Sequence, residues 1–537
     1  MAALRKLMAW VHTWTGVVAA VLLFVIFWTG TIAVFDQEID RWMLPETRLP
    51  AAPASVSVDR LVVPLAEVVA HGAPQWTVAL PSPRDPVLRF SFRDSAGQNR
   101  SLSIDPSTGR LLADSGSKGA SGFLVPLHYT LHLKRWNLGS WIVGAAGMAM
   151  LVSLVSGVIV HKRILADFFL FRPAKRFQRA ALDLHALMGV TALPFHFTIT
   201  LSGLIVFFGI YFPTAYSALY GTGPEARQRF DADAFGSFVR PPSGSPGRLG
   251  SVDAMIAEAG RRWNGDRVSM VQVKNFGDAN VFVDVRRAFE AGVTRHLDRI
   301  TFDGRSGVQL DRFEPGPVVT AQRFISGIHR IRFDHWGLRW LYFAGGLGGC
   351  AMIVTGCLFW LAARRASHAK KGLAGVRVME ALTIGGVTGL VIATCAYLVV
   401  NRMLPPSFGI DGGDRSGVEI WTFSLCWLGA VAHAAVRTAP GTRAASSKAW
   451  REQCIAIAAL SLGAVALNAL TDEGVAAWLA GAFHWPVAGV DLMLISSAIV
   501  AVAASRRLSL SGRFDAHAPS AVGSIRRRDR SRKAGLR

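Results

Sequence analysis

The sequence is poor in charged residues. Only 18% of its 537 residues are Asp, Glu, Lys or Arg, whereas 51% are hydrophobic. A typical soluble domain carries about 25% charged residues. The low charge content therefore argues against a soluble protein of this length and indicates several long apolar segments.

Cysteine is also scarce, and the five cysteines form no CxxC pair. All of them lie inside apolar runs: Cys350, Cys357, Cys395, Cys426 and Cys454. This distribution argues against a disulfide framework or a zinc site and favours a role as small packing residues. A Walker loop and the HExxH and GxSxG motifs are absent as well, which argues against the enzyme classes that depend on them.

Eight apolar stretches are long enough to cross a bilayer, which takes about 20 residues of helix. They run roughly over 10–35, 138–161, 186–210, 338–362, 377–400, 418–436, 453–470 and 486–505. The first stretch is too long for a signal peptide, has no A-x-A site and has an internal copy, so we expect it to be retained.

Lys and Arg account for a net charge of +22, and they gather in alternate loops between the apolar stretches and in the tail. The loop 471–485 contains neither residue. By the positive-inside rule, this alternation places both termini in the cytoplasm of a multi-pass protein of the bacterial inner membrane. It also explains the positive charge without a nucleic-acid partner.

The first and third stretches are copies of one another. VHTWTG at the start of the first aligns without a gap with LHALMG of the third, so that His12 matches His185 and Thr29-Gly30 matches Ser202-Gly203. The second and fourth stretches match in the same way, with Ser156-Gly157 on Thr355-Gly356. A two-residue shift then places His132 on His329. The sequence thus predicts a duplicated core.

The segments between these stretches also repeat. Residues 59–111 and 252–310 each begin with a helix-like pattern, continue with alternating strands and end with a strand, an acidic turn and a strand. We therefore expect a mainly α membrane protein of about eight transmembrane helices, with two small α+β domains outside the cytoplasm. The predicted order is helix 1–36, domain 37–126, helix 127–163, cytoplasmic loop 164–183, helix 184–212, domain 213–325, helix 326–364, a four-helix module 365–505 and a basic tail 506–537.

Four histidines stand at matching positions of this duplication. His12 and His185 lie near the cytoplasmic ends of their spans, and His132 and His329 lie near the extracytoplasmic starts of theirs. Ionisable residues at membrane depth usually serve a function, and haem iron accepts two axial imidazoles. The pattern favours two haems whose iron is held by these four residues over four interfacial histidines that only form hydrogen bonds or meet lipid headgroups. Small residues at Gly16, Gly189, Gly144 and Gly345 are expected to let the macrocycle approach the helices.

Four other histidines form a second tier of candidates. His128 lies one helical turn before His132, and His335 lies close to His329. His196 follows His185 on nearly the same helix face, and His161 ends the second span. We expect structural or supporting roles for these residues, although His128 is an alternative ligand to His132.

The sequence resembles the PepSY-associated transmembrane helix family, whose members are also described as iron-regulated membrane proteins. The motifs VHTWTG, SIDPSTGRLL, LHALMG and GIHRIRF carry this resemblance over roughly residues 5–365. The resemblance implies a four-helix core with periplasmic PepSY domains. Some members are linked to the reduction of ferric siderophores with two histidine-held b-type haems, so the resemblance implies a ferric-siderophore reductase.

Such a reductase would take electrons from a quinol or a cytoplasmic donor and pass them to a periplasmic ferric complex. No flavin or NAD domain is visible in the sequence. Two alternatives stay open. PepSY-like domains resemble inhibitory modules of peptidase propeptides, which suggests a regulator of an extracytoplasmic peptidase or a ligand sensor. The four additional spans leave room for a siderophore or metal permease component.

Overall fold

A computed structural model describes residues 2–516, apart from 71, 95, 162–176, 213, 289–291, 296, 372, 407, 409–413, 440 and 472–483. Most of the basic loop 164–183, the loop 471–485 and most of the tail, on which the predicted orientation depends, lie outside the described residues. Contact clustering divides the chain into two compact units. The first contains the described parts of 1–363, 404–418 and 481–490, and the second contains the rest.

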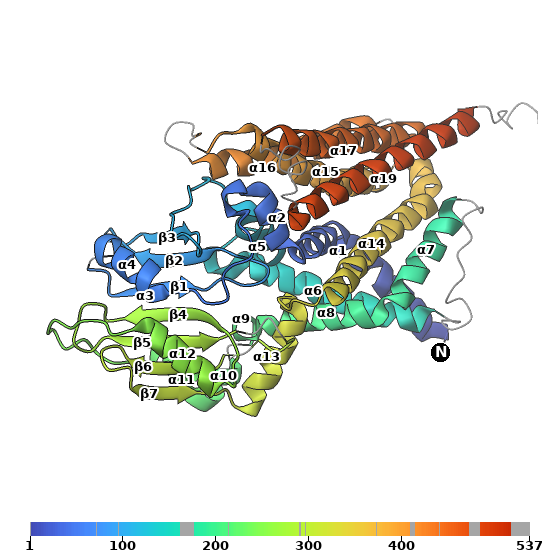
Figure 1. The fold of residues 1–537 in the computed structure, drawn as a ribbon. Coiled ribbons are helices and arrows are strands. Elements are labelled where there is room, and N and C mark those ends of the chain that lie inside the picture. Colours follow the sequence, from blue (N-terminus) through green and yellow to red (C-terminus); the bar gives the residue numbers. More distant parts are fainter. Residues whose placement is uncertain are drawn as a thin grey trace, which may run out of the picture. The chain divides into compact units, whose positions relative to one another are not determined.

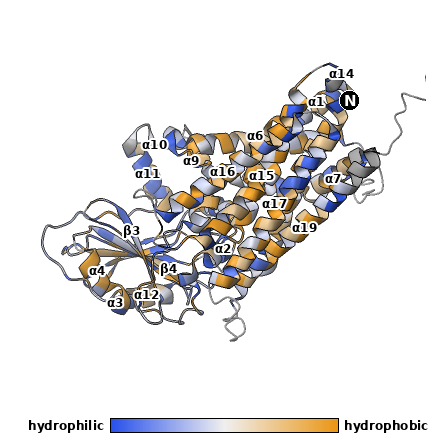
Figure 2. Cartoon of the chain, turned by 90° about the horizontal axis from the view of Figure 1, so that it is seen from above, coloured by the Kyte–Doolittle hydropathy of each residue, from blue (hydrophilic) through white to orange (hydrophobic). Residues whose placement is uncertain are grey.

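Within the described residues, seven helices are long and apolar enough to span a membrane, and a bent pair forms an eighth candidate. Figure 2 shows that hydrophobic residues dominate these helices, whereas hydrophilic ones are frequent in the strands. The chain is therefore a multi-pass membrane protein. The spans are α1 (Ala2–Ala33), α6 (Leu138–Val160), α7 (Phe177–Thr191) with α8 (Leu193–Val206), α14 (Trp336–Lys370), α15 (Gly375–Met403), α16 (Arg415–Thr438), α17 (Arg443–Thr471) and α19 (Trp485–Ala516).

The bend of 65° between α7 and α8 distinguishes the third span from its copy, the unbroken α1. Pro194 stands in the first turn of α8. Proline has no N–H to donate and its ring crowds the preceding turn, so a helix breaks there. The matching residue of α1 is Val21, which leaves that helix continuous.

The two α+β segments form one sheet, not two separate domains as expected. The seven strands lie in the order β3-β2-β1-β4-β5-β6-β7, and every neighbouring pair is antiparallel. The join is β1 against β4, with Trp76 opposite Val273 and Val78 opposite Val271. The strands are β1 (Gln75–Ala79), β2 (Leu88–Arg93), β3 (Asn99–Ile104), β4 (Val268–Lys274), β5 (Phe282–Arg287), β6 (Arg299–Asp303) and β7 (Gln309–Phe313).

Helices from both halves cover this sheet (Figure 1). They are α3 (Val58–Leu61), α4 (Val63–Val69) and α12 (Val252–Arg262). Their apolar residues share one core with alternating residues of the strands, including the buried Trp76, Phe90 and Phe302. Because one core holds residues of both halves, burial of apolar surface stabilises the joined sheet.

Short helices connect the sheet to the spans. They are α2 (Asp36–Met43), α5 (Val125–Thr130), α9 (Phe208–Tyr211), α10 (Thr214–Tyr220), α11 (Pro224–Phe235) and α13 (Pro317–Arg330), with single turns at Pro45–Thr47, Ala120–Leu124 and Arg135–Asn137. Glu38 of α2 accepts hydrogen bonds at 2.8 Å from Arg84, which precedes β2, and from Arg339 of α14. Burial alone would raise the pKa of Glu38, but the two guanidinium groups bring it below its ordinary value. This buried network ties the sheet to the spans.

The second unit is a helical bundle held by small residues and buried polar contacts. A Cβ at Gly385 of α15 would stand 2.7 Å from the backbone of Val431 in α16. Thr388 of α15 donates a hydrogen bond at 2.6 Å to Gln453 of α17. Close helix approach through glycine and polar contacts between helices are typical of packing inside a membrane.

Candidate functional site

Two pairs of histidines face each other in the first unit. The ring centres of His12 on α1 and His185 on α7 are 6.1 Å apart, with an angle of 75° between the ring planes. The ring centres of His128 on α5 and His329 on α13 are 6.0 Å apart, with an angle of 24°. Each pair takes one residue from each half of the duplication.

All four rings are held in the same way, by a hydrogen bond between Nδ1 and a backbone carbonyl of another helix. Since a carbonyl oxygen only accepts, Nδ1 carries the hydrogen and the lone pair is on Nε2. The contacts are His12 to Ser153 and His185 to Met352 at 2.8 Å, and His128 to Ile26 and His329 to Ile199 at 2.9 Å. The site thus contains four imidazoles of one tautomer, each with a basic Nε2.

Each ring also packs on a glycine four residues after its carbonyl partner. A Cβ on that glycine would come within 2.7–3.1 Å of the imidazole Cε1, too close for the ring to stay in place. The pairs are Gly157 with His12, Gly356 with His185, Gly30 with His128 and Gly203 with His329. These are the glycines of the repeated Ser/Thr-Gly steps, so the duplication preserves a seat for each ring.

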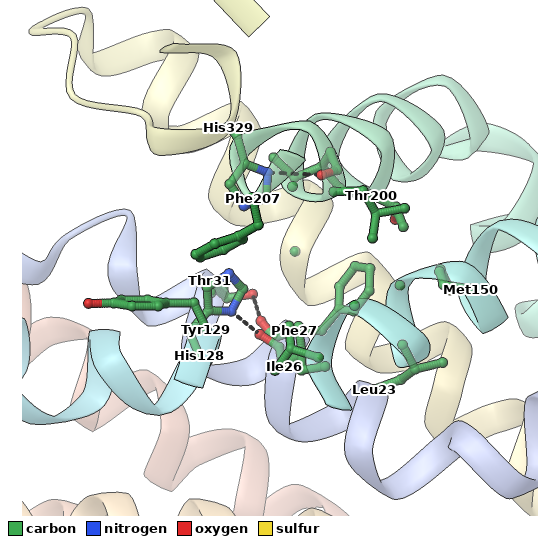
Figure 3. A pocket seen from close by; sticks show the side chains of 18 of the residues that line it. Leu23, Ile26, Phe27, Thr31, His128, Tyr129, Met150, Thr200, Phe207 and His329 are labelled. Carbon is green, nitrogen blue, oxygen red and sulfur yellow. Dashed lines mark hydrogen bonds between the residues drawn. The ribbon is translucent and has the colours of Figure 1, made fainter. Parts of the chain in front are cut away.

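An apolar cavity surrounds the pair His128 and His329 (Figure 3). It contains about 880 Å³ of space not filled by protein atoms, part of it open to solvent. Helices α1, α6 and α8 supply most of the lining, including Phe27, Met150 and Phe195, and Phe207 follows α8.

His132, expected to face His329, does not do so, and His128 takes that place. Helix α5 ends at Thr130, and both Leu131 and His132 have left-handed backbone angles, with φ of 49° and 56°. This turn directs the His132 ring onto Phe123, with ring centres 4.9 Å apart, and Nε2 forms a hydrogen bond of 2.9 Å with the Phe123 carbonyl. That contact engages the nitrogen that would bind a metal.

The other second-tier histidines have separate surroundings. His196 is fully buried, touches Phe27 and Phe195, and forms a 3.2 Å contact with the Gly345 carbonyl. His335 accepts a hydrogen bond of 3.1 Å from the backbone N–H of Leu338 at the start of α14. His161 is the residue that ends α6. The structure brings none of these three into either pair.

The glycines predicted to admit a macrocycle differ from those that seat the rings. A Cβ at Gly144 would meet the Tyr211 ring at 2.6 Å, and one at Gly345 would meet Phe195 at 2.6 Å. Gly189 has only the Met352 sulfur nearby, at 3.5 Å, and Gly16 has no neighbour within 4 Å. Of the four, only Gly144 lines the cavity around His128 and His329.

The fold and the site define a class of protein: a multi-pass membrane protein with a duplicated helical core, a seven-stranded antiparallel sheet and paired imidazoles. The model of the PepSY-associated TM region matches residues 9–363, and the chain belongs to this family. It is also similar to the uncharacterized protein PA4219 of Pseudomonas aeruginosa, with 29% identity over 289 residues that cover 50% of this chain and 69% of that protein.

Proposed function

We propose that this protein is a haem-dependent reductase of the bacterial inner membrane, which transfers electrons across the bilayer to an iron(III) complex outside the cytoplasm. The observation that carries the proposal is the pair of facing imidazoles, present twice with the same hydrogen bond and the same glycine seat. His12 with His185, and His128 with His329, are the residues that would hold the two haem irons. His132 is no longer among them.

The spacing of the rings fits one metal ion between each pair. An imidazole nitrogen lies about 2 Å from a bound transition metal, and the ring centre lies roughly 1 Å beyond it. Two rings on opposite sides of one ion therefore have centres about 6 Å apart, against 6.1 and 6.0 Å here. Each pair offers two imidazole nitrogens to one iron, whose remaining ligands would come from a porphyrin.

The residues of this chain prepare both sites for that group. Four backbone carbonyls orient the rings and increase the basicity of Nε2. They belong to Ser153, Met352, Ile26 and Ile199. The cavity beside His128 and His329 has a mainly apolar lining, which suits a macrocycle with apolar faces. Haem, when bound, supplies reversible one-electron transfer.

The two pairs lie at different depths along α1. His12 belongs to one pair, and Ile26, whose carbonyl holds His128, lies fourteen residues further on, roughly 21 Å along the helix. With the N-terminus in the cytoplasm, the pair of His128 and His329 and the sheet lie on the periplasmic side. A quinol would release two electrons and two protons per molecule, and each iron(III) acceptor would take one electron to become iron(II).

The test is an absorption spectrum of the full chain, purified in detergent from cells supplied with a haem precursor. We expect a Soret band and α-bands of reduced b-type haem, with two haems per chain by pyridine haemochrome assay. Addition of an iron(III) chelate to the reduced protein is expected to restore the oxidised spectrum. Purified, folded protein without a Soret band would contradict the proposal.

A further inference from the structure

A second cavity in the first unit is lined by arginines. It contains about 680 Å³ of space not filled by protein atoms, and its cationic residues are Arg227 of α11 and Arg323 and Arg330 of α13. None of the described residues that line it is Asp or Glu. All charged residues of this cavity wall are therefore positive, and such a wall attracts anions.

A fourth arginine lies against the same helix. Gly327 of α13 packs so closely on Val293 that a Cβ there would stand 1.7 Å from the Val293 carbonyl oxygen. This contact brings Arg295 to α13, where its N–H lies 3.5 Å from the Arg323 carbonyl. Burial and then the nearby Arg330 and Arg323 are the main causes that lower the pKa of Arg295 to about 10. Like charges held together in this way gain stability when an anion binds among them.

Two arginines in this part of the fold form ion pairs with carboxylates. Arg227 pairs with Asp231 at 3.0 Å, and Arg332, which follows α13, pairs with Asp36 at 2.7 Å. Two buried polar atoms of the cavity wall, Arg323 Nε and Gln322 Oε1, have no hydrogen-bond partner among the described residues. Buried polar atoms without a partner are costly and indicate a missing ligand or water.

The remaining wall is aromatic. Arg323 stacks on Phe235 at 4.8 Å and Arg227 on Phe230 at 5.8 Å, and Phe207 lines the opening as well. Guanidinium groups and phenyl rings together suit a flat anionic ligand, because the planar cation binds oxygen anions and both groups stack on rings.

The arginine cavity adjoins the cavity that His128 and His329 line. Phe207 lines both, and its ring centre lies 6.0 Å from that of Tyr129. Figure 3 shows Phe207 beside His329. Arg330 follows His329 directly in the chain. The two cavities therefore share the Phe207 side chain as part of their lining.

We propose that the arginine-lined cavity binds the electron acceptor, and that this acceptor is an anionic iron(III) chelate with aromatic oxygen donors, such as a catecholate or phenolate complex. The inference rests on the proposed function and names its substrate class. Reduction of iron(III) to iron(II) adds one negative charge to the chelate. The cationic wall stabilises the reduced complex more than the oxidised one, and so favours the transfer.

The test measures binding with a redox-inert analogue, so that it does not depend on electron transfer. The full chain in phosphatidylcholine nanodiscs is titrated with trianionic gallium(III) tris-catecholate and with neutral gallium(III) tris-acetohydroxamate in a calorimeter. We expect the anionic complex to bind at least about tenfold more tightly. Arg323→Gln and Arg330→Gln are each expected to weaken it about tenfold, the loss of one charge-assisted hydrogen bond.

Arg305→Gln is the matched control, because Arg305 is an exposed arginine in the turn between β6 and β7. It removes the same charge outside the cavity and is expected to leave the affinity unchanged. Equal affinity of wild type and both cavity variants would overturn the inference. So would loss of binding when phosphatidylglycerol is added to the nanodiscs, since the arginines would then belong to a lipid headgroup site.

The two proposals fail separately. A normal haem spectrum without selective binding of the gallium tris-catecholate would overturn the acceptor site and leave the reductase in place. Selective binding to folded protein that contains no haem would overturn the reductase and leave the arginine-lined cavity as a binding site for the anionic chelate.

Discussion

Asp59 and Asp253 each accept hydrogen bonds from the start of the helix that carries the other. Asp59 Oδ1 accepts from the backbone N–H of Val252 at 2.8 Å, and Asp253 Oδ1 accepts from that of Val58 at 2.7 Å. The aspartates occupy matching positions of the duplication. Because the first N–H groups of a helix lack partners within it, each carboxylate stabilises the opposite helix and joins the two halves.

Substitution of either aspartate by alanine is expected to destabilise the sheet. Asp59→Ala and Asp253→Ala should each lower the free energy of unfolding by about 1–2 kcal/mol, the usual cost of a lost helix cap. Thermal unfolding of the purified chain would report this as a lower Tm. Glu67→Ala, an exposed carboxylate on α4, is the control and should leave the Tm unchanged; an equal effect of all three variants would contradict the reciprocal capping.

Histidine substitutions distinguish the two pairs. His12→Ala and His185→Ala should each remove one haem per chain, because the pair keeps a single axial ligand. His128→Ala and His329→Ala should remove the other haem. The pyridine haemochrome assay measures the number retained.

The variant His132→Ala tests the choice between neighbouring candidates. Its Nε2 is engaged by Phe123, so the variant should keep both haems. Loss of a haem from His132→Ala, with retention in His128→Ala, would restore the pairing expected from the sequence.

Substitution of the glycines that pack against the imidazole rings should lower the haem content as much as substitution of the histidines themselves. A Cβ at Gly203 would stand 2.7 Å from His329 Cε1, so Gly203→Ala should displace the ring. It should therefore lower the haem content of the site formed by His128 and His329. Gly16→Ala is a matched control within a helix, because no atom lies within 4 Å of the added Cβ. A full haem complement in both variants would show that the His329 ring does not need a glycine at position 203 to bind haem.

The ring angles predict two different ferric signals in electron paramagnetic resonance. The planes of His12 and His185 are nearly perpendicular, at 75°, whereas those of His128 and His329 are nearly parallel, at 24°. Perpendicular axial rings leave two iron d orbitals close in energy and give a larger g anisotropy than parallel rings. His185→Ala should therefore abolish the more anisotropic low-spin signal and His329→Ala the other; one signal lost in both variants would contradict this assignment.

Asp40 should make stability depend on pH near neutrality. Its carboxylate accepts hydrogen bonds from the N–H groups of Ala120 and Ser121, and burial raises its pKa from 3.8 to about 6. The folded state thus holds the proton more tightly than the unfolded chain. The stabilisation is present below about pH 4 and is lost as the pH rises through about 6.

The comparison with Asp40→Asn isolates this effect. Between about pH 4.5 and about pH 7.5, wild type should lose about 2 kcal/mol of stability relative to the variant, since one pKa unit corresponds to about 1.4 kcal/mol and part of the effect already lies below about pH 4.5. Tm measured across this range is the readout, with Glu67→Gln as control. Parallel Tm curves for wild type and Asp40→Asn would refute the prediction.

Local signals in the sequence were sufficient for the spans, the duplication and the strands. Apolar length and periodicity are properties of contiguous residues, and the seven spanning helices with one bent pair agree with the eight predicted stretches. The single sheet was not predictable in this way. Its join, between Trp76 and Val273, connects residues far apart in the chain. The sequence of neither strand indicates whether that strand lies at the edge of a sheet or pairs with a strand of the other half.

The choice between His128 and His132 was also beyond the sequence. The gapless register of the second and fourth spans places His329 opposite Thr130, two residues from each candidate. Left-handed residues at Leu131 and Ile331 end α5 and α13, and they decide which histidine remains on the helix. The Ser/Thr-Gly steps were visible in the sequence, but their role required the positions of the rings.

The arginine cavity gave no sequence signal, because Arg227 and Arg323 line it from two separate segments and the neighbouring Arg295 lies in a third. Arginine is frequent throughout this basic chain, so its spacing carries little information. The packing of Gly327 on Val293 brings the segments of Arg323 and Arg295 together.

Each imidazole pair draws one ring from either half, and the strands β1 and β4 join the halves in antiparallel fashion. Antiparallel pairing of equivalent strands is the relation that a two-fold axis generates, as in an isologous homodimer. A single repeat would contain half of every pair and an open sheet edge, and two such chains would complete both at once. Gene fusion of that kind would place both halves in one polypeptide, where each could differ from the other; here the third span is broken at Pro194 and the arginine-lined cavity lies in the second half.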